Sequence, residues 1–138
     1  MPYLFDTDAL SEVVRPRPAE RFLAWLATVP AEEQAASAVS IGELYRGAFR
    51  SPNRERWLDR IDHELLPRVV VLPYDTPIAR LYGEIRARME TEGRMPGESD
   101  LQIAATALHH GLSVVTGNLR HFERVPGLRV ERVLADSR

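Results

Sequence analysis

Two patterns of hydrophobic and polar positions alternate along the chain. Short apolar runs at residues 3–5, 35–39, 69–72 and 113–116 have the length of strands. Between them, apolar residues recur three and four positions apart, which is typical of amphipathic helices. A weaker apolar run at 128–130 predicts a last strand. The pattern therefore predicts strands that alternate with helices.

Prolines and glycines mark the ends of the predicted helices. Pro67 ends one helix, Thr76-Pro77 starts the next with a cap and a proline at its first position, and Gly111 ends another. A loop is expected over residues 93–97. The first helix is expected to begin at Asp8 or Ser11, and the later ones cover about residues 18–30, 41–49, 52–67, 76–92 and 100–110.

Alternating strands and helices favour parallel strands joined by right-handed crossovers. The expected fold class is therefore α/β: a three-layer α/β/α sandwich with a central, mostly parallel sheet of about four or five strands. The chain has 138 residues, which is a usual size for one domain. We therefore expect a single domain over residues 1–138.

Composition excludes several classes of protein. Hydrophobic residues make up 44% and charged residues 28%, which argues against wholesale disorder. No apolar run approaches the length of a membrane span and the first residues do not resemble a signal peptide, so we expect a cytoplasmic protein with no membrane partner. Cysteine and lysine are both absent, which excludes disulfides, thiolate metal sites and lysine chemistry.

Polar residues that could carry chemistry follow the predicted strands. Asp6 comes after the first strand, Glu43 lies in the helix after the second, and Asn118 follows the fourth. Asp100 opens the helix that leads into the fourth strand. Ligands of open parallel sheets bind beyond the carboxyl ends of the strands, so these four side chains are expected to meet at one rim.

Each of these residues also has a simpler interpretation. Asp6 and Asn118 suit turns or caps, Ser40 and Glu43 have capping-box spacing, and Asp100 complements a helix dipole. Together, however, clustered carboxylates repel one another unless a cation is present. Mg²⁺ or Mn²⁺ suits such oxygen ligands, and carboxylate-bound Mg²⁺ is used mainly in phosphoryl transfer.

Four segments resemble, in order, the four sequence blocks of the PIN domain, and specifically of VapC-type toxins from bacterial toxin–antitoxin pairs. The segments are YLFDTDALSE, SAVSIGELYRGA, ESDLQIAATALHHG and VVTGNLRHF. The resemblance covers about residues 2–130. It implies the PIN fold and a Mg²⁺- or Mn²⁺-dependent endoribonuclease that a VapB-type antitoxin holds inactive.

The resemblance also implies roles for single residues. Asp6, Glu43 and Asp100 match the metal-binding acids of the first three blocks. The fourth block often carries aspartate, whereas this chain has Asn118, which brings no charge and weakens the case for a second tightly bound ion. Thr116 stands at the polar position before it and is expected to orient its neighbours by hydrogen bonding.

Two further acids and two arginines each have two alternative roles. Asp8 is either a ligand or the cap of the first helix, and Glu98 is a candidate outer acid. Arg46 and Arg120 are candidate contacts for RNA phosphates, with ordinary surface ion pairs as the alternative. The histidines are interpreted as surface or packing residues, with His121 nearest the substrate: His63, His109, His110 and His121.

The early helices carry more large apolar side chains than one thin layer easily buries. These residues are Phe22, Trp25, Leu26, Tyr45, Phe49, Trp57 and Leu58. In VapC-like proteins such helices contact the antitoxin, so we expect a homodimer that binds a VapB-like antitoxin as a hetero-oligomer. The antitoxin is expected to place a basic side chain near the acidic rim, and operator DNA would be bound only through the antitoxin.

Two alternatives remain open at this point. Phe5-Asp6-Thr7-Asp8 also resembles the opening motif of haloacid-dehalogenase-like phosphatases, but the chain has no lysine and is short for that fold. The other alternative is a catalytically inert PIN-fold module that retains only its partner contacts. Asn118 is the one feature that favours it.

Overall fold

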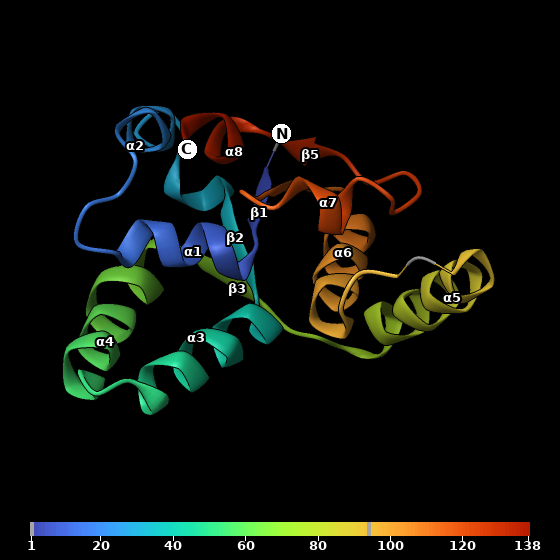
Figure 1. The fold of residues 1–138 in the computed structure, drawn as a ribbon, viewed down its shortest axis with the longest axis horizontal. Coiled ribbons are helices and arrows are strands. Elements are labelled where there is room, and N and C mark those ends of the chain that lie inside the picture. The colour runs from blue at the N-terminus through green and yellow to red at the C-terminus, as the bar shows by residue number, and fades with distance from the viewer. Residues whose placement is uncertain (1, 94) are drawn as a thin grey trace.

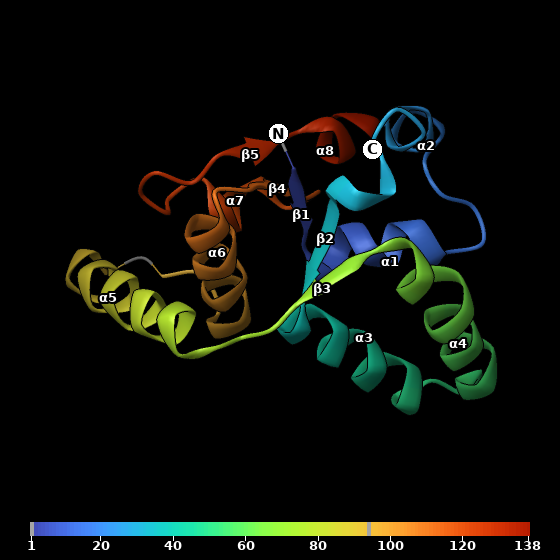
Figure 2. The same ribbon diagram turned by 180° about the vertical axis from the view of Figure 1, so that it is seen from behind.

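Five parallel strands form the centre of the computed structural model, which describes residues 2–93 and 95–138 (Figures 1 and 2). The strand order is β3-β2-β1-β4-β5, and every neighbouring pair is parallel. The strands are β1 (Tyr3–Phe5), β2 (Gln34–Ser37), β3 (Val70–Leu72), β4 (Ser113–Val115) and β5 (Val130–Glu131). The predicted α/β class with a parallel sheet of four or five strands is confirmed.

Alternate residues of β1, β2 and β4 face opposite layers of helices. Leu4, Ala35 and Val114 pack in one buried cluster with α5 (Thr76–Glu92) and α6 (Glu98–His110). Phe5, Ala36 and Val115 pack in the other cluster, and the helices on that side lie opposite α5 and α6 in Figure 1. These helices are α1 (Thr7–Val14), α2 (Glu20–Leu26), α3 (Ala38–Arg50), α4 (Arg54–Arg60) and α8 (Val133–Ser137).

The chain reverses its direction across the sheet at β1. From β1 it adds β2 and then β3 on one side, and it returns past β1 to add β4 and β5 on the other side. Such a switch point leaves a crevice at the carboxyl ends of the strands, where open parallel sheets bind their ligands. The carboxyl ends of β1 and β4 therefore mark the place to search for a site.

Several helix boundaries differ from those predicted. Ser37, rather than Ser40, caps α3, because its side chain accepts from the Val39 N–H at 3.1 Å. Ser40 is buried inside the first turn, so the capping box with Glu43 is not formed. Likewise, α6 begins two residues early at Glu98, after Gly97.

Other departures are confined to short turns. The segment predicted as one helix over 52–67 continues from α4 into a π-helical turn (Ile61–Leu65) and a 3₁₀ turn (Leu66–Arg68). A further 3₁₀ turn (Ala31–Glu33) and the one-turn helix α7 (Leu119–Phe122) were not predicted, because four residues are too few to show helical periodicity. Within residues 2–93 and 95–138, no helix has the length and apolar character needed to cross a bilayer.

Candidate active site

Asp6 stands where β1 passes into α1. Its N–H continues the sheet by donating to the Val115 carbonyl at 3.1 Å, and its Oδ1 caps α1 by accepting from the Ala9 N–H at 2.8 Å. Its Oδ2 accepts a hydrogen bond from the Thr116 hydroxyl at 2.6 Å. Asp6, and not Asp8, is therefore the cap of the first helix. Three hydrogen bonds, one through its backbone and two through its side chain, hold it at the end of the sheet.

The charge state of Asp6 is unusual. Asp6 is 4% exposed, and this burial is the main cause that raises the pKa of Asp6 from 3.8 to about 7. The hydrogen bonds from Thr116 and Ala9 oppose the rise, whereas the nearby carboxylates of Asp8 and Asp100 add to it. A buried acid among other acids is an arrangement that a bound cation would stabilise.

The other two predicted acids come from the N-terminal halves of α3 and α6. Glu43 lies in the second turn of α3 and accepts a hydrogen bond from the Thr7 hydroxyl at 2.5 Å. Asp100 lies in the first turn of α6, and its Oδ2 is 2.6 Å from Nδ1 of His121. Burial raises the pKa of Asp100, His121 lowers it, and the charge of Glu43 raises it again. The structure thus brings Asp6, Asp100 and Glu43 to one acidic rim.

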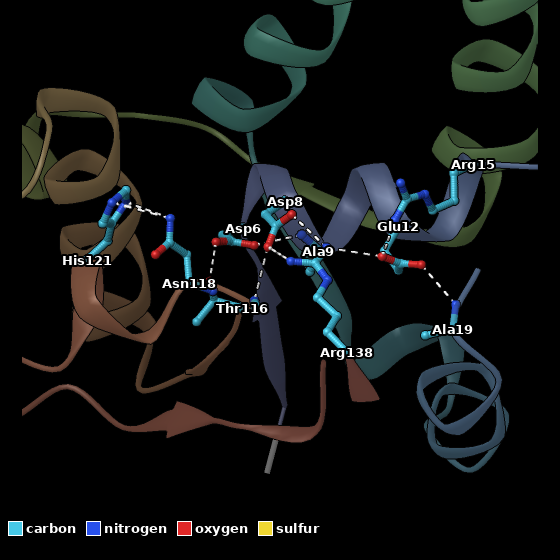
Figure 3. A network of polar contacts seen from close by, with 11 residues as sticks. Asp6, Asp8, Ala9, Glu12, Arg15, Ala19, Thr116, Asn118, His121 and Arg138 are labelled. Atoms are coloured by element: carbon cyan, nitrogen blue, oxygen red, sulfur yellow. Dashed lines mark hydrogen bonds and ion pairs between the residues drawn. The ribbon is translucent and has the colours of Figure 1, made fainter. Parts of the chain in front are cut away.

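Thr116 joins the first and fourth sequence blocks. Its fully buried hydroxyl donates to Asp6 and accepts from the N–H of Asn118 at 2.9 Å (Figure 3). The Asn118 side chain is exposed, and its Nδ2 lies 3.3 Å from both ring nitrogens of His121. His121 is therefore part of the rim. The spacing between His121 and the acids along the sequence did not indicate this position.

The donor set of the rim suits Mg²⁺ or Mn²⁺, because these hard cations prefer carboxylate and amide oxygens. Both oxygens of Asp6 accept one hydrogen bond each and retain a further lone pair. Within the described residues, no three acidic or histidine side chains converge closely enough to hold an ion as they stand. Binding would therefore require the carboxylates to turn toward a common point.

Asp8 points into a different network, which Figure 3 shows beside the rim. Both oxygens of Asp8 accept from the Arg138 guanidinium at 2.8 Å, and its Oδ2 also accepts from the Gly117 N–H at 3.2 Å. The same guanidinium donates to the buried Glu12 at 3.0 Å. The close approach explains the glycine at 117, because a Cβ there would lie 2.3 Å from an Arg138 nitrogen.

Glu12 is a buried carboxylate with all its partners in place. It is 2% exposed and accepts from Arg15 at 2.9 Å, from the Ala19 N–H at 2.9 Å and from Arg138. Burial alone would raise the pKa of Glu12, but these hydrogen bonds outweigh burial and hold the pKa below its ordinary value. No sequence pattern indicated this network, since its members are far apart along the chain.

We expect Glu12→Gln to lower the free energy of unfolding by about 1–3 kcal/mol, because the amide at this buried position loses the charge that pairs with Arg15 and Arg138 and can accept fewer of the hydrogen bonds. The lowered pKa means that the ionised carboxylate contributes stability at neutral pH, and that this contribution is lost as the pH falls through the pKa of the folded protein. Urea unfolding at neutral pH measures the loss. Glu64→Gln, which breaks an exposed pair with Arg60, should change stability by less than about 0.5 kcal/mol.

The remaining candidates are Glu98, Arg46 and Arg120. Glu98 lies 3.3 Å from the Tyr82 hydroxyl and 3.6 Å from the Arg86 guanidinium, so it contacts α5. Arg46 and Arg120 are exposed, and neither forms an ion pair or a side-chain hydrogen bond with the residues that the structure describes. They are therefore free to contact a phosphate.

The expected excess of exposed apolar side chains is only partly present. Phe22 and Leu26 are buried in the core, contrary to the expectation, because α2 packs against α8 and the sheet. Phe49 is 53% exposed, and Trp57 lines a pocket of about 370 Å³ between α1, α3 and α4. Asp8 and Glu43 line the same pocket, which therefore borders the acidic rim.

Comparison with known proteins agrees with this geometry. A family model of the PIN domain matches residues 3–128. Ribonuclease VapC2 of Haemophilus influenzae is 36% identical over 129 residues, which cover 94% of this chain and 96% of that protein. The tRNA(fMet)-specific endonuclease VapC of Shigella flexneri is 37% identical over 132 residues, covering 94% of this chain and 96% of that protein.

A solved structure supports the same assignment. DNA-bound VapBC from Salmonella typhimurium has a TM-score of 0.87 and 34% identity, and the match covers 95% of this chain and 97% of that one. The parallel sheet with acids at its carboxyl edge defines the class as a PIN-type nuclease fold. The chain belongs to the PIN domain family, and within it to the VapC-type ribonuclease toxins. The haloacid-dehalogenase alternative is therefore wrong.

Proposed function

We propose that this ribonuclease is a Mg²⁺- or Mn²⁺-dependent endoribonuclease whose metal ligands are Asp6, Glu43 and Asp100. The observation that carries the proposal is that these three acids, from the cap of α1, the second turn of α3 and the first turn of α6, interact electrostatically near the switch point of the sheet. A bound Mg²⁺ would polarise the scissile phosphate and favour ionisation of an attacking water. Three carboxylates and one divalent ion leave a net charge of about −1.

The protein's own residues supply binding and orientation. Thr116 orients Asp6 and the backbone of Asn118, and the Asn118 amide faces the same rim without adding charge. Arg46 and Arg120 would contact RNA phosphates on either side of the acids, which alone would repel the substrate. Asp8 is bound to Arg138, so we assign it a supporting role and not that of a ligand.

We further propose that a VapB-like antitoxin inhibits the enzyme by occupying the pocket beside Trp57. The pocket offers an apolar wall next to Asp8 and Glu43, which suits an apolar segment followed by a basic side chain. The Salmonella relative was solved as a VapBC complex bound to DNA. By analogy, this chain would form a homodimer that binds the antitoxin in the cytoplasm, with operator DNA contacted by the antitoxin.

Expression and cleavage test the proposal directly. Induction in bacteria that lack the antitoxin should arrest growth and create new RNA 5′ ends, and co-expression of the neighbouring antitoxin gene should restore growth. Purified protein should cut RNA only when Mg²⁺ or Mn²⁺ is added after EDTA treatment, with initiator tRNA as the first substrate because a relative is specific for it. Normal growth at a verified protein level, without cleavage, would instead identify an inert module.

A further inference from the structure

His121 lies at the rim between a side chain of the third sequence block, Asp100, and one of the fourth, Asn118. Its Nδ1 is 2.6 Å from Oδ2 of Asp100, and both ring nitrogens lie 3.3 Å from Nδ2 of Asn118. His121 belongs to the single turn α7, which the fully buried side chain of Phe122 fixes to the core. The backbone of His121 is bonded as well, since its N–H donates to the Asn118 carbonyl at 3.2 Å.

Each of the three acids at the rim is held by a donor from another part of the chain. The hydroxyl of Thr116 holds Asp6, and the hydroxyl of Thr7 holds Glu43. For Asp100, His121 is the side-chain partner among the residues that the structure describes. A metal-ligating carboxylate is commonly fixed by such an outer hydrogen bond.

We propose that His121 is a positioning residue of the nuclease: it holds Oδ2 of Asp100 and leaves Oδ1 to bind the metal ion. This inference rests on the proposed function of the acids. The bond needs a hydrogen on Nδ1, which both the charged ring and one neutral tautomer carry, so it does not depend on a change of protonation. The ring also limits the positions of the Asn118 amide and thereby connects the third and fourth blocks.

The surroundings distinguish this pair from an ordinary surface ion pair. His63 and Asp59 form a second histidine–aspartate pair on the exposed helical face, at 3.7 Å and with side chains 75% and 71% exposed. In contrast, the Asp100 side chain is 23% exposed and that of His121 is 47% exposed, and their contact is more than 1 Å shorter. The His63 pair therefore serves as a matched control.

The test compares His121→Ala, His121→Asn and His63→Ala with the parent protein. Mg²⁺ and Mn²⁺ binding is measured by calorimetry on RNA-free protein, alongside urea unfolding and cleavage of one RNA. We expect His121→Ala to weaken metal binding about tenfold or more while the protein remains folded. Asparagine carries an amide donor close to the place of Nδ1, so His121→Asn should recover most of the affinity. His63→Ala should bind metal as the parent does.

Each outcome has a separate meaning. Parental metal affinity in His121→Ala would overturn the proposal. If cleavage were slower at that unchanged affinity, His121 would act on the RNA and not through Asp100. Equal losses in His121→Ala and His121→Asn would also contradict it. Failure of the parent itself to bind metal or cleave RNA would overturn the proposed function, and this inference with it.

Discussion

Asp6→Asn should abolish RNA cleavage and, at the same time, make the metal-free protein more stable at pH 8. The side chain is buried, and its pKa of about 7 shows that ionisation is disfavoured in the folded protein. A pKa this far above the ordinary 3.8 corresponds to a cost of up to about 4 kcal/mol when the group is charged. Asparagine removes the charge, can still accept from the Ala9 N–H, and is as good a helix cap as aspartate.

The sign of the pH dependence follows from the two pKa values. Between about pH 4 and pH 7 the folded protein retains a proton on Asp6 that the unfolded chain has released. The free energy of unfolding of the parent should therefore fall through this range as the pH rises, and the contribution of Asp6 should be constant above it. In Asp6→Asn the part of this decline that Asp6 causes should disappear, and only the smaller decline from Asp100, whose pKa is also raised, should remain. Unfolding at pH 8 should require about 1–3 kcal/mol more than in the parent.

Urea unfolding in EDTA at several pH values measures this effect, and a repeat with Mg²⁺ adds a test of the metal site. A ligand of the folded state stabilises it by mass action, so Mg²⁺ should stabilise the parent and leave Asp6→Asn nearly unchanged. Asp75→Asn is the control, because Asp75 caps α5 from an exposed position outside the rim. A decline with pH that is as steep in Asp6→Asn as in the parent would show that another group causes it.

The fold could be predicted from the sequence because its signals are local and repeated. Strand-length apolar runs alternate with amphipathic segments, and this alternation alone implies a parallel sheet and its site-bearing edge. Boundaries were less certain where two residues could serve as caps. Ser37 and Ser40 are both suitable, and the choice of Ser37 follows from where β2 ends against its neighbours.

The acids of the rim could be found because each follows a strand or begins a helix. The partners that hold them could not, since a hydrogen bond such as that of Thr116 with Asp6 joins residues 110 positions apart. The same reason explains why the contacts of Arg138 with Asp8 and Glu12 were missed. His121 lacked a spacing signal because α7 is only one turn long.

Asp100→Asn and Asn118→Asp should change the metal requirement in opposite directions. Asp100→Asn removes one of three negative charges, so the ion should bind poorly and the cleavage rate should fall by at least about a hundredfold. Asn118→Asp adds a fourth carboxylate beside His121, where the present amide contributes no charge. This variant should remain active and reach half its maximal rate at a Mg²⁺ concentration roughly tenfold lower than the parent.

Cleavage of one fixed RNA over a range of Mg²⁺ concentrations, for the parent and both variants, measures the two effects. Parental activity in Asp100→Asn would show that the acidic rim is not the metal site. An inactive Asn118→Asp would have a different meaning, because the charge at the rim would be greater and yet catalysis would be lost. The amide of Asn118 would then act as a hydrogen-bond donor, to a phosphate oxygen or to the attacking water, and a carboxylate cannot replace it in that role.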